Sequence, residues 1–167
     1  SIMKGLLFVL LTLPTWSFAV SRVGGGKVRS LNSGFELNVQ SPFMVATLEK
    51  ESVRCLGPDA ITVNNGTLIS LNQYFEITEF NNEFENVNSL DKEQLIHRFQ
   101  DSGWSEQSSS MSCALSMRYE QDGAVAYFIT WGKGKGLAIK GTDTSDTVKM
   151  IENALKTLQV PTGCEWR

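Results

Sequence analysis

The chain has 167 residues, of which 41% are hydrophobic and 20% are charged, so it holds enough apolar material for one core and is too short for two ordinary domains. Lys and Arg number 15 and Asp and Glu number 18, which gives a formal net charge of -3. This balance predicts no general attraction to nucleic acid or to an anionic membrane, although it leaves a local basic patch open.

The first residues have the layout of a secretory signal peptide. Lys4 precedes an apolar run from Leu6 to Leu13, and the small-residue pattern Ser17-Phe18-Ala19 follows Pro14. The run is shorter than the about 20 apolar residues that a membrane-spanning helix needs. We therefore expect residues 1–19 to be removed and the protein to be exported, to the periplasm or the medium, without a permanent membrane anchor.

The next segment, residues 20–33, is glycine-rich and basic and lacks periodicity, which predicts a flexible leader. A single domain is expected over residues 34–167. It begins with a strand in which Phe35, Leu37 and Val39 alternate with polar residues, and a second extended segment follows at residues 43–51.

Two β-prone runs, residues 60–63 and 67–71, meet at Asn64-Asn65-Gly66. Asn and Gly tolerate the positive φ angles of a tight turn, so these runs predict a β-hairpin. A further extended stretch containing Phe75 and Ile77 is expected to follow it.

A helix is predicted from Ser89, as its N-cap, to Gly103. His97 falls beside its apolar face and is expected at the surface, because a surface or capping imidazole is more common than a metal ligand and no Cys or second His stands at helical spacing from it. We expect no metal site. Trp104 directly follows the helix and either packs beneath the serine-rich residues 105–112 or joins a binding surface.

Three strands are expected next, at residues 113–119, 124–131 and 137–140, with Asp122-Gly123 as the first turn. A last helix follows, with Asp143 or Thr144 as its N-cap and with one apolar face, formed by Val148, Ile151, Leu155 and Leu158.

The run from Gly132 to Gly136, Gly-Lys-Gly-Lys-Gly, resembles a phosphate-binding loop only superficially. A P-loop requires G-x-x-x-x-G-K-[ST] and must open a helix, whereas this run precedes a strand. It therefore predicts a hairpin turn, and no cofactor is expected. Trp131 at the end of the preceding strand either caps the core or joins Lys133 and Lys135 in a small contact surface for a polar or anionic partner.

The cysteines Cys55, Cys113 and Cys164 allow one disulfide and one free thiol in an exported protein. We favour Cys55–Cys113, because both lie in expected strands, and leave the other pairings open. The free thiol could form an intermolecular disulfide, or act as a nucleophile with His97 as its base.

Short connections after Cys113 require a largely antiparallel sheet, so we predict an α+β domain with two helices packed on that sheet. The segments GFELNVQSPF, residues 34–43, and GLAIKGTDTSDTVKMIENALKTLQV, residues 136–160, resemble the first strand and the closing strand and helix of PsbP/Mog1-type domains. The chain departs from their P-x-W pattern at Ser41-Pro42-Phe43. The resemblance implies an α/β/α sandwich in an exported, non-catalytic accessory protein.

We therefore expect an exported soluble binding or accessory protein, monomeric and not an enzyme, that acts by surface contact on a protein or envelope component. An inhibitor of a secreted or cell-wall enzyme is one alternative. An enzyme that uses His97 or a cysteine is the other.

Overall fold

The computed structural model describes residues 20–24, 26–48, 52–81 and 91–166. The expected signal peptide, residues 1–19, lies outside the described residues, as does the expected N-cap Ser89.

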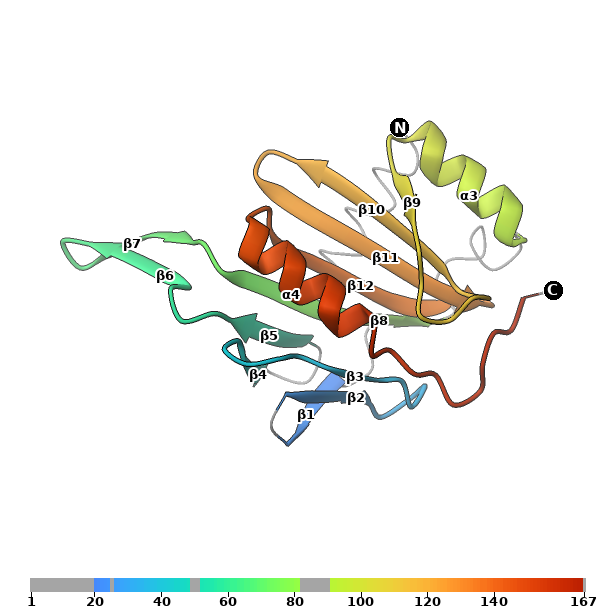
Figure 1. Ribbon diagram of the computed structural model, residues 1–167, viewed down its shortest axis with the longest axis horizontal. Helices are drawn as coiled ribbons and strands as arrows, with labels where there is room; N and C mark the ends of the chain where they lie inside the picture. The colour runs from blue at the N-terminus through green and yellow to red at the C-terminus, as the bar shows by residue number, and fades with distance from the viewer. Residues whose placement is uncertain (1–19, 25, 49–51, 82–90, 167) are drawn as a thin grey trace.

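A seven-stranded antiparallel sheet forms the centre of the molecule (Figure 1). Its strands, in spatial order, are β4 (Met44–Leu48), β5 (Ser52–Leu56), β8 (Tyr74–Asn81), β12 (Lys135–Thr142), β11 (Ala124–Gly132), β10 (Leu115–Gln121) and β9 (Ser105–Gln107). With the helices α3 (Lys92–Asp101) and α4 (Ser145–Leu155), this confirms the predicted α+β fold with a mainly antiparallel sheet.

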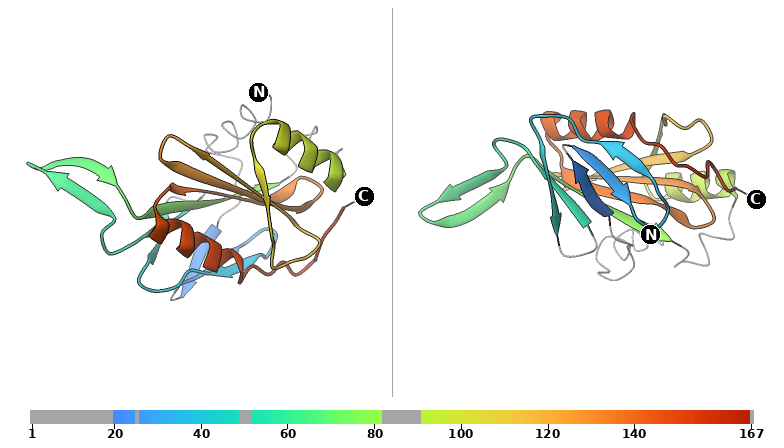
Figure 2. Two further views of the ribbon diagram at one scale, coloured as in Figure 1. Left: turned by 45° about the horizontal axis from the view of Figure 1, so that its top comes forward. Right: turned by 90° about the horizontal axis from the view of Figure 1, so that it is seen from below.

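The two helices cover opposite faces of this sheet. On β11, Tyr127 and Ile129 join a core cluster that includes Ile151 of α4, whereas Phe128 joins a second cluster that includes Phe99 of α3. Successive side chains of a strand point to opposite faces, so β11 is buried on both sides. Figure 2 shows the sheet between the two helices.

A smaller antiparallel sheet packs beside α4 on the same face. It consists of β1 (Val20–Gly24), β2 (Lys27–Ser30) and β3 (Glu36–Asn38). The prediction of a flexible leader at residues 20–33 is therefore wrong. Val28 is fully buried, and Arg29 and Lys27 both pair with Glu36 on β3.

Both helices begin at side-chain caps. The carboxylate of Asp91 accepts from the backbone N–H of Gln94 at 2.8 Å, and the Gln94 side chain accepts from the Asp91 N–H, so Asp91, not Ser89, is the N-cap of α3. Thr144, one of the two predicted residues, is the N-cap of α4.

Three hairpins close through two residues with positive φ, namely Asn65-Gly66, Asp122-Gly123 and Lys133-Gly134. All three were predicted from their sequences, and positive φ at both positions is the conformation that suits the twist of paired strands. The first hairpin, β6 (Ile61–Asn64) with β7 (Thr67–Leu71), is a two-stranded sheet of its own and projects from the body (Figure 1).

Candidate functional site

The hairpin β6–β7 has one aliphatic face and one polar face. Ile61 is paired with Leu71 and Val63 with Leu68, while Thr62 is paired with Ser70. Paired residues share a face and successive residues alternate, so the first two pairs lie together and the third lies on the other side. The register shifts by one residue between Thr62 and Val63, which leaves Ile69 as the additional residue of a bulge.

The aliphatic face is exposed to solvent. Six large hydrophobic side chains of the described residues are exposed, and four of them are on this hairpin, with exposed fractions between 56% and 59%: Ile61, Val63, Leu68 and Ile69. A soluble domain ordinarily covers such a cluster, and a contiguous apolar patch marks an interaction surface. We call this cluster the hairpin patch.

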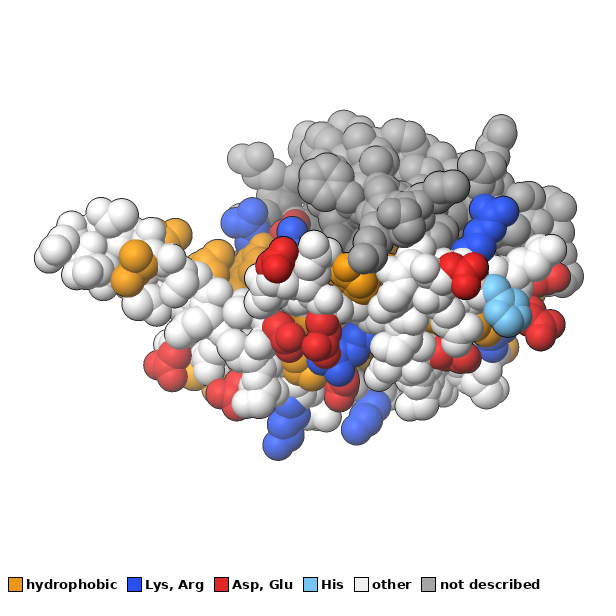
Figure 3. All heavy atoms as spheres, turned by 90° about the horizontal axis from the view of Figure 1, so that it is seen from above, with side chains coloured by type: hydrophobic (Ala, Val, Ile, Leu, Met, Phe, Trp, Pro, Cys, Tyr) orange, Lys and Arg blue, Asp and Glu red, His pale blue; other side chains and the backbone are white. Residues whose placement is uncertain are grey.

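The hairpin also carries no charge. Residues 60–75 contain no Asp, Glu, Lys or Arg, and Figure 3 shows no charged side chain on the projecting part of the molecule. Among the described strands, neither β6 nor β7 has a partner on its outer edge. Edge strands without charges or bulky protection are suited to pairing with another chain.

The structure does not form the contact surface that was expected at the β11–β12 hairpin, whose turn region carries Lys133 and Lys135. Trp131 is fully buried and packs edge-on against Phe35, with ring centroids 5.9 Å apart. The expectation that its ring forms an exposed surface beside the lysines is therefore wrong. Lys133 is exposed, whereas Lys135 pairs with Glu165 at 2.8 Å.

The C-terminal tail, residues 156–166, contacts this hairpin at both Trp131 and Lys135. The N–H of Glu165 donates to the carbonyl of Trp131 at 2.6 Å, and the hydrogen bond from Lys135 lowers the pKa of the Glu165 carboxyl. Trp104 is also buried, between Phe99 and Tyr119, which agrees with the packing alternative.

The disulfide joins Cys113 to Cys164, with Cα atoms 6.0 Å apart, and Cys55 is free and buried. The favoured Cys55–Cys113 pairing is thus wrong. Cys55 points into the core from β5, and the strands β8, β12 and β11 lie between β5 and β10, which Cys113 precedes. Two cysteines that far apart in a sheet cannot reach the geometry of a disulfide.

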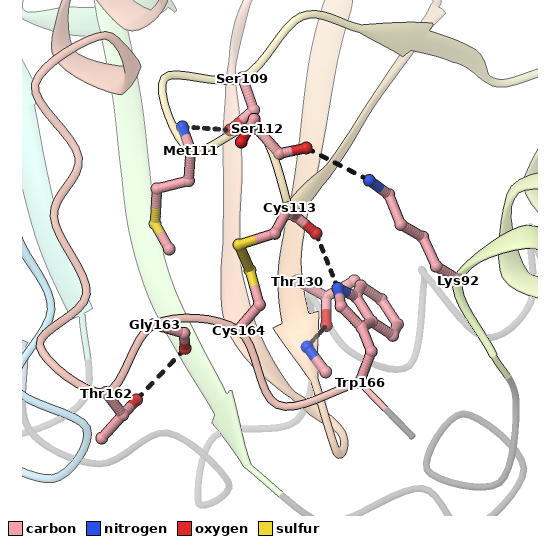
Figure 4. The surroundings of a disulfide bond; sticks show 11 residues. Lys92, Ser109, Met111, Ser112, Cys113, Thr130, Thr162, Gly163, Cys164 and Trp166 are labelled. Carbon is pink, nitrogen blue, oxygen red and sulfur yellow. Dashed lines mark hydrogen bonds between the residues drawn. A yellow bond between two sulfur atoms is a disulfide. The ribbon is translucent and has the colours of Figure 1, made fainter.

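Figure 4 shows how this bond anchors the serine-rich segment that precedes it. The indole N–H of Trp166 donates to the carbonyl of Cys113 at 2.7 Å, and the amine of Lys92 on α3 donates to the carbonyl of Ser112 at 3.5 Å. The tail and α3 therefore both hold this segment in place.

The structure does not bring together the residues of a Cys–His centre. His97 is exposed on α3, and Cys55 is buried under the opposite face of the sheet, where burial raises the pKa of its thiol. A raised pKa keeps the thiol protonated and weakly nucleophilic. Within the part of the chain that the structure describes, no group of three or more His, Cys, Asp and Glu residues could hold a metal ion.

None of the described helices is long and apolar enough to cross a membrane. Comparison with protein-family models, with curated proteins and with solved structures finds no match, so the resemblance to PsbP/Mog1-type domains stays a prediction.

Sequence reasoning located the hairpin β6–β7 but not its exposed aliphatic face. The signal that could have drawn attention to this face was the absence of charge over residues 60–75. A strand that exposes one face alternates apolar with charged or polar residues, whereas an aliphatic run beside a tight turn is equally typical of a buried hairpin.

Proposed function

We propose that this protein is an exported, non-catalytic binding protein that docks onto a partner protein through the hairpin patch. The single observation that carries the proposal is the aliphatic face of β6–β7, which is exposed in the described structure. Export is supported by the signal-peptide pattern of residues 1–19 and by the Cys113–Cys164 disulfide, which persists in oxidising compartments.

The energetics favour a covered hairpin. Burial of a Val, Leu or Ile side chain contributes about 1.5–3 kcal/mol, and on this hairpin that contribution is largely unused. A partner that covers the hairpin patch and pairs with one free edge gains apolar contact and main-chain hydrogen bonds together. An apolar groove beside an open sheet edge is the partner surface that fits this hairpin.

A lipid surface fits less well. Anionic membranes attract clusters of Lys and Arg, but residues 60–75 contain none, and the adjacent charged residues, Asp59 and Glu76, are acidic.

A second copy of the chain also fits less well. The strands β6 and β7 contain only four and five residues. Stable interfaces bury roughly 1,200–2,000 Å² in total, and two such short hairpins, paired only with each other, offer too little surface. A partner with a groove surrounds the hairpin and buries more of it.

The test places a photo-crosslinking amino acid at Leu68 on the aliphatic face or, as the matched control, at Ser70 on the polar face, in the full chain expressed in its native cells. We expect a discrete protein adduct from Leu68 and little from Ser70. The adduct from Leu68 should fall about thirtyfold when Val63 is replaced by Glu, because an apolar anchor contributes about 2 kcal/mol to binding. Thr62→Glu, on the opposite face, should leave it unchanged.

Three results would overturn the proposal: equal adducts from both positions, adducts with lipid alone, or adducts only with a second copy of this chain. Circular dichroism of each variant checks that the fold is retained.

The second candidate function is inhibition of an enzyme that the hairpin patch binds. A projecting hairpin has the shape that enters an enzyme cleft, which favours a secreted or cell-wall enzyme as the partner. In that case the purified crosslinked partner has hydrolytic activity that the protein lowers, and Val63→Glu abolishes the inhibition. Failure to inhibit leaves the docking proposal standing and rejects this second function.

A further inference from the structure

A cavity of about 250 Å³ lies between the serine-rich segment and the C-terminal end of α4. It is lined by residues of four elements, β9, β10, β11 and α4, and of the connecting segments: Gln107, Ser108, Ser109, Ser110, Ser116, Tyr127, Ile129, Glu152, Leu155, Lys156 and Leu158. It is separate from the hairpin patch, because the base of the hairpin contacts the other end of α4, where the N-cap Thr144 donates to the carbonyl of Asn72.

The fold creates this cavity because α4 does not cover the whole face of the sheet. The helix packs against β12, β8 and β3. Ser116 on β10 is paired with Ile129 on β11, so the two side chains form a floor beside the helix. The serine-rich segment closes the remaining side.

That segment is fixed in place. The hydroxyl of Ser110 lies 3.2 Å from the carbonyl of Leu155 at the end of α4 and 3.2 Å from that of Leu158 just beyond it. The Cys113–Cys164 disulfide holds the following residues (Figure 4). The cavity is therefore formed before any ligand enters, as in most small-molecule sites.

Polar groups converge on the cavity from two sides. The hydroxyl of Tyr127 donates to one carboxylate oxygen of Glu152 at 3.1 Å, and burial raises the pKa of Tyr127, so this hydroxyl stays protonated. Among the described residues, no partner is found for the hydroxyl of Ser116, whose residue is 4% exposed, or for the second carboxylate oxygen of Glu152. Both are available to a ligand.

The cavity selects neither an anion nor a cation. Glu152 and Lys156 stand four residues apart on one side of α4, so their charges balance. The remaining polar groups are hydroxyls and one amide, which donate and accept equally, and Ile129, Leu155 and Leu158 add an apolar surface. A ring with several hydroxyls and an apolar C–H face matches this combination.

A second hollow of about 430 Å³ adjoins the first and shares Ser110, Lys156 and Leu158 with it. The hydrogen bond from Ser110 to the carbonyl of Leu158 lies at the border between the two hollows, so a second ring has to pass over it. The geometry points to a saccharide: we propose that the first hollow binds one sugar ring, held by Glu152, Tyr127 and Ser116, and that the second receives the next ring of the same glycan.

Titration of the full oxidised chain with N-acetylglucosamine, its β-1,4-linked dimer and glucose, followed by NMR chemical shifts, tests this proposal. We expect millimolar binding of at least one monosaccharide and tighter binding of the dimer, with shifts centred on Tyr127 and Ser116. Glu152→Gln and Ser116→Val should each weaken binding about tenfold, the usual effect of losing one hydrogen bond to a charged or buried group. Lys149→Gln, on an exposed residue of the same helix, and Ser70→Ala should change it less than twofold.

Binding should also weaken in Cys113→Ser/Cys164→Ser, which frees the serine-rich segment, while circular dichroism confirms that the sheet persists. Saccharide binding that survives both Glu152→Gln and Ser116→Val would overturn the proposal. So would preference for putrescine or inorganic phosphate, or no shift with any of the three sugars. Because none of these measurements depends on the hairpin patch, failure here leaves the docking proposal untouched.

Discussion

The hairpins β6–β7 and β11–β12 have the same type of turn but different surroundings. Each closes through two residues with positive φ, Asn65-Gly66 in the first and Lys133-Gly134 in the second. Yet β11–β12 lies inside the seven-stranded sheet beneath the C-terminal tail, whereas β6–β7 projects alone. A turn motif determines that two strands pair, but the rest of the chain determines whether the pair becomes core or stays exposed.

The largest difference between the two hairpins should appear in their sensitivity to truncation. Trp131→Ala removes a fully buried ring and should cost about 3–5 kcal/mol of unfolding free energy. Leu68→Ala removes an exposed side chain and should stay within about 0.5 kcal/mol. Urea unfolding followed by circular dichroism measures both. Equal losses would mean that the hairpin patch is packed in the free protein.

A smaller difference should appear at the glycines of the two hairpins. Gly66 and Gly132 both have positive φ, so alanine strains either backbone by about 1–2 kcal/mol. At Gly66 an added Cβ meets no atom within 4 Å, but at Gly132 it lies 2.6 Å from the backbone of Glu165 and Trp166. Displacing the tail adds about 1–3 kcal/mol to Gly132→Ala.

The same unfolding assay, run on the two single variants Gly132→Ala and Gly66→Ala side by side, measures this difference. Equal costs would show that the tail does not press on β11–β12 in solution.

The smallest effect should be a pH dependence of the unfolding free energy that arises at β11–β12 and not at β6–β7. Lys135 lowers the pKa of Glu165 in the folded protein, so the ion pair stabilises the fold at neutral pH. This contribution is lost as the pH falls from the ordinary value of 4.5 through the lowered one, and it amounts to about 0.2–1 kcal/mol because the pair is partly exposed.

Lys135→Met should therefore be less stable than the wild type at neutral pH and equally stable in acid, below the lowered pKa of Glu165. The midpoint of urea unfolding, measured at each of these two pH values, tests this. Lys133→Met is the comparison: Lys133 is exposed and lowers the pKa of Glu165 less than Lys135 does, so this change should shift the neutral-pH midpoint by less than Lys135→Met. A constant difference between wild type and Lys135→Met across this range would contradict the assignment.

Local features of the fold could be predicted from the sequence, and long-range pairings could not. Asn65-Gly66 and Thr144 act through neighbours a few residues away, so their patterns are visible in any short window. The strand β2 has only two inward residues, Val28 and Ser30, and depends on pairing with β1 and β3. A pattern that short, next to three glycines, is typical of a linker.

The candidate sites show the same limit. Trp131 at a strand end could cap the core or join the two lysines at the surface, and only the fold shows that its ring packs against Phe35, which is distant in the chain. The aliphatic run of β6 and β7 is typical of a buried hairpin, and only the absence of a covering element leaves it in solvent among the described residues.

The position of the three cysteines along the chain has a consequence for biogenesis. Cys55 and Cys113 leave the ribosome before Cys164, so in the exported protein that we propose, an oxidant acting during translocation would meet the wrong pair first. Insertion of β5 between β4 and β8 shields the thiol of Cys55. Under that proposal, correct oxidation requires that the sheet assembles before the oxidant acts, or that an isomerase replaces the premature bond.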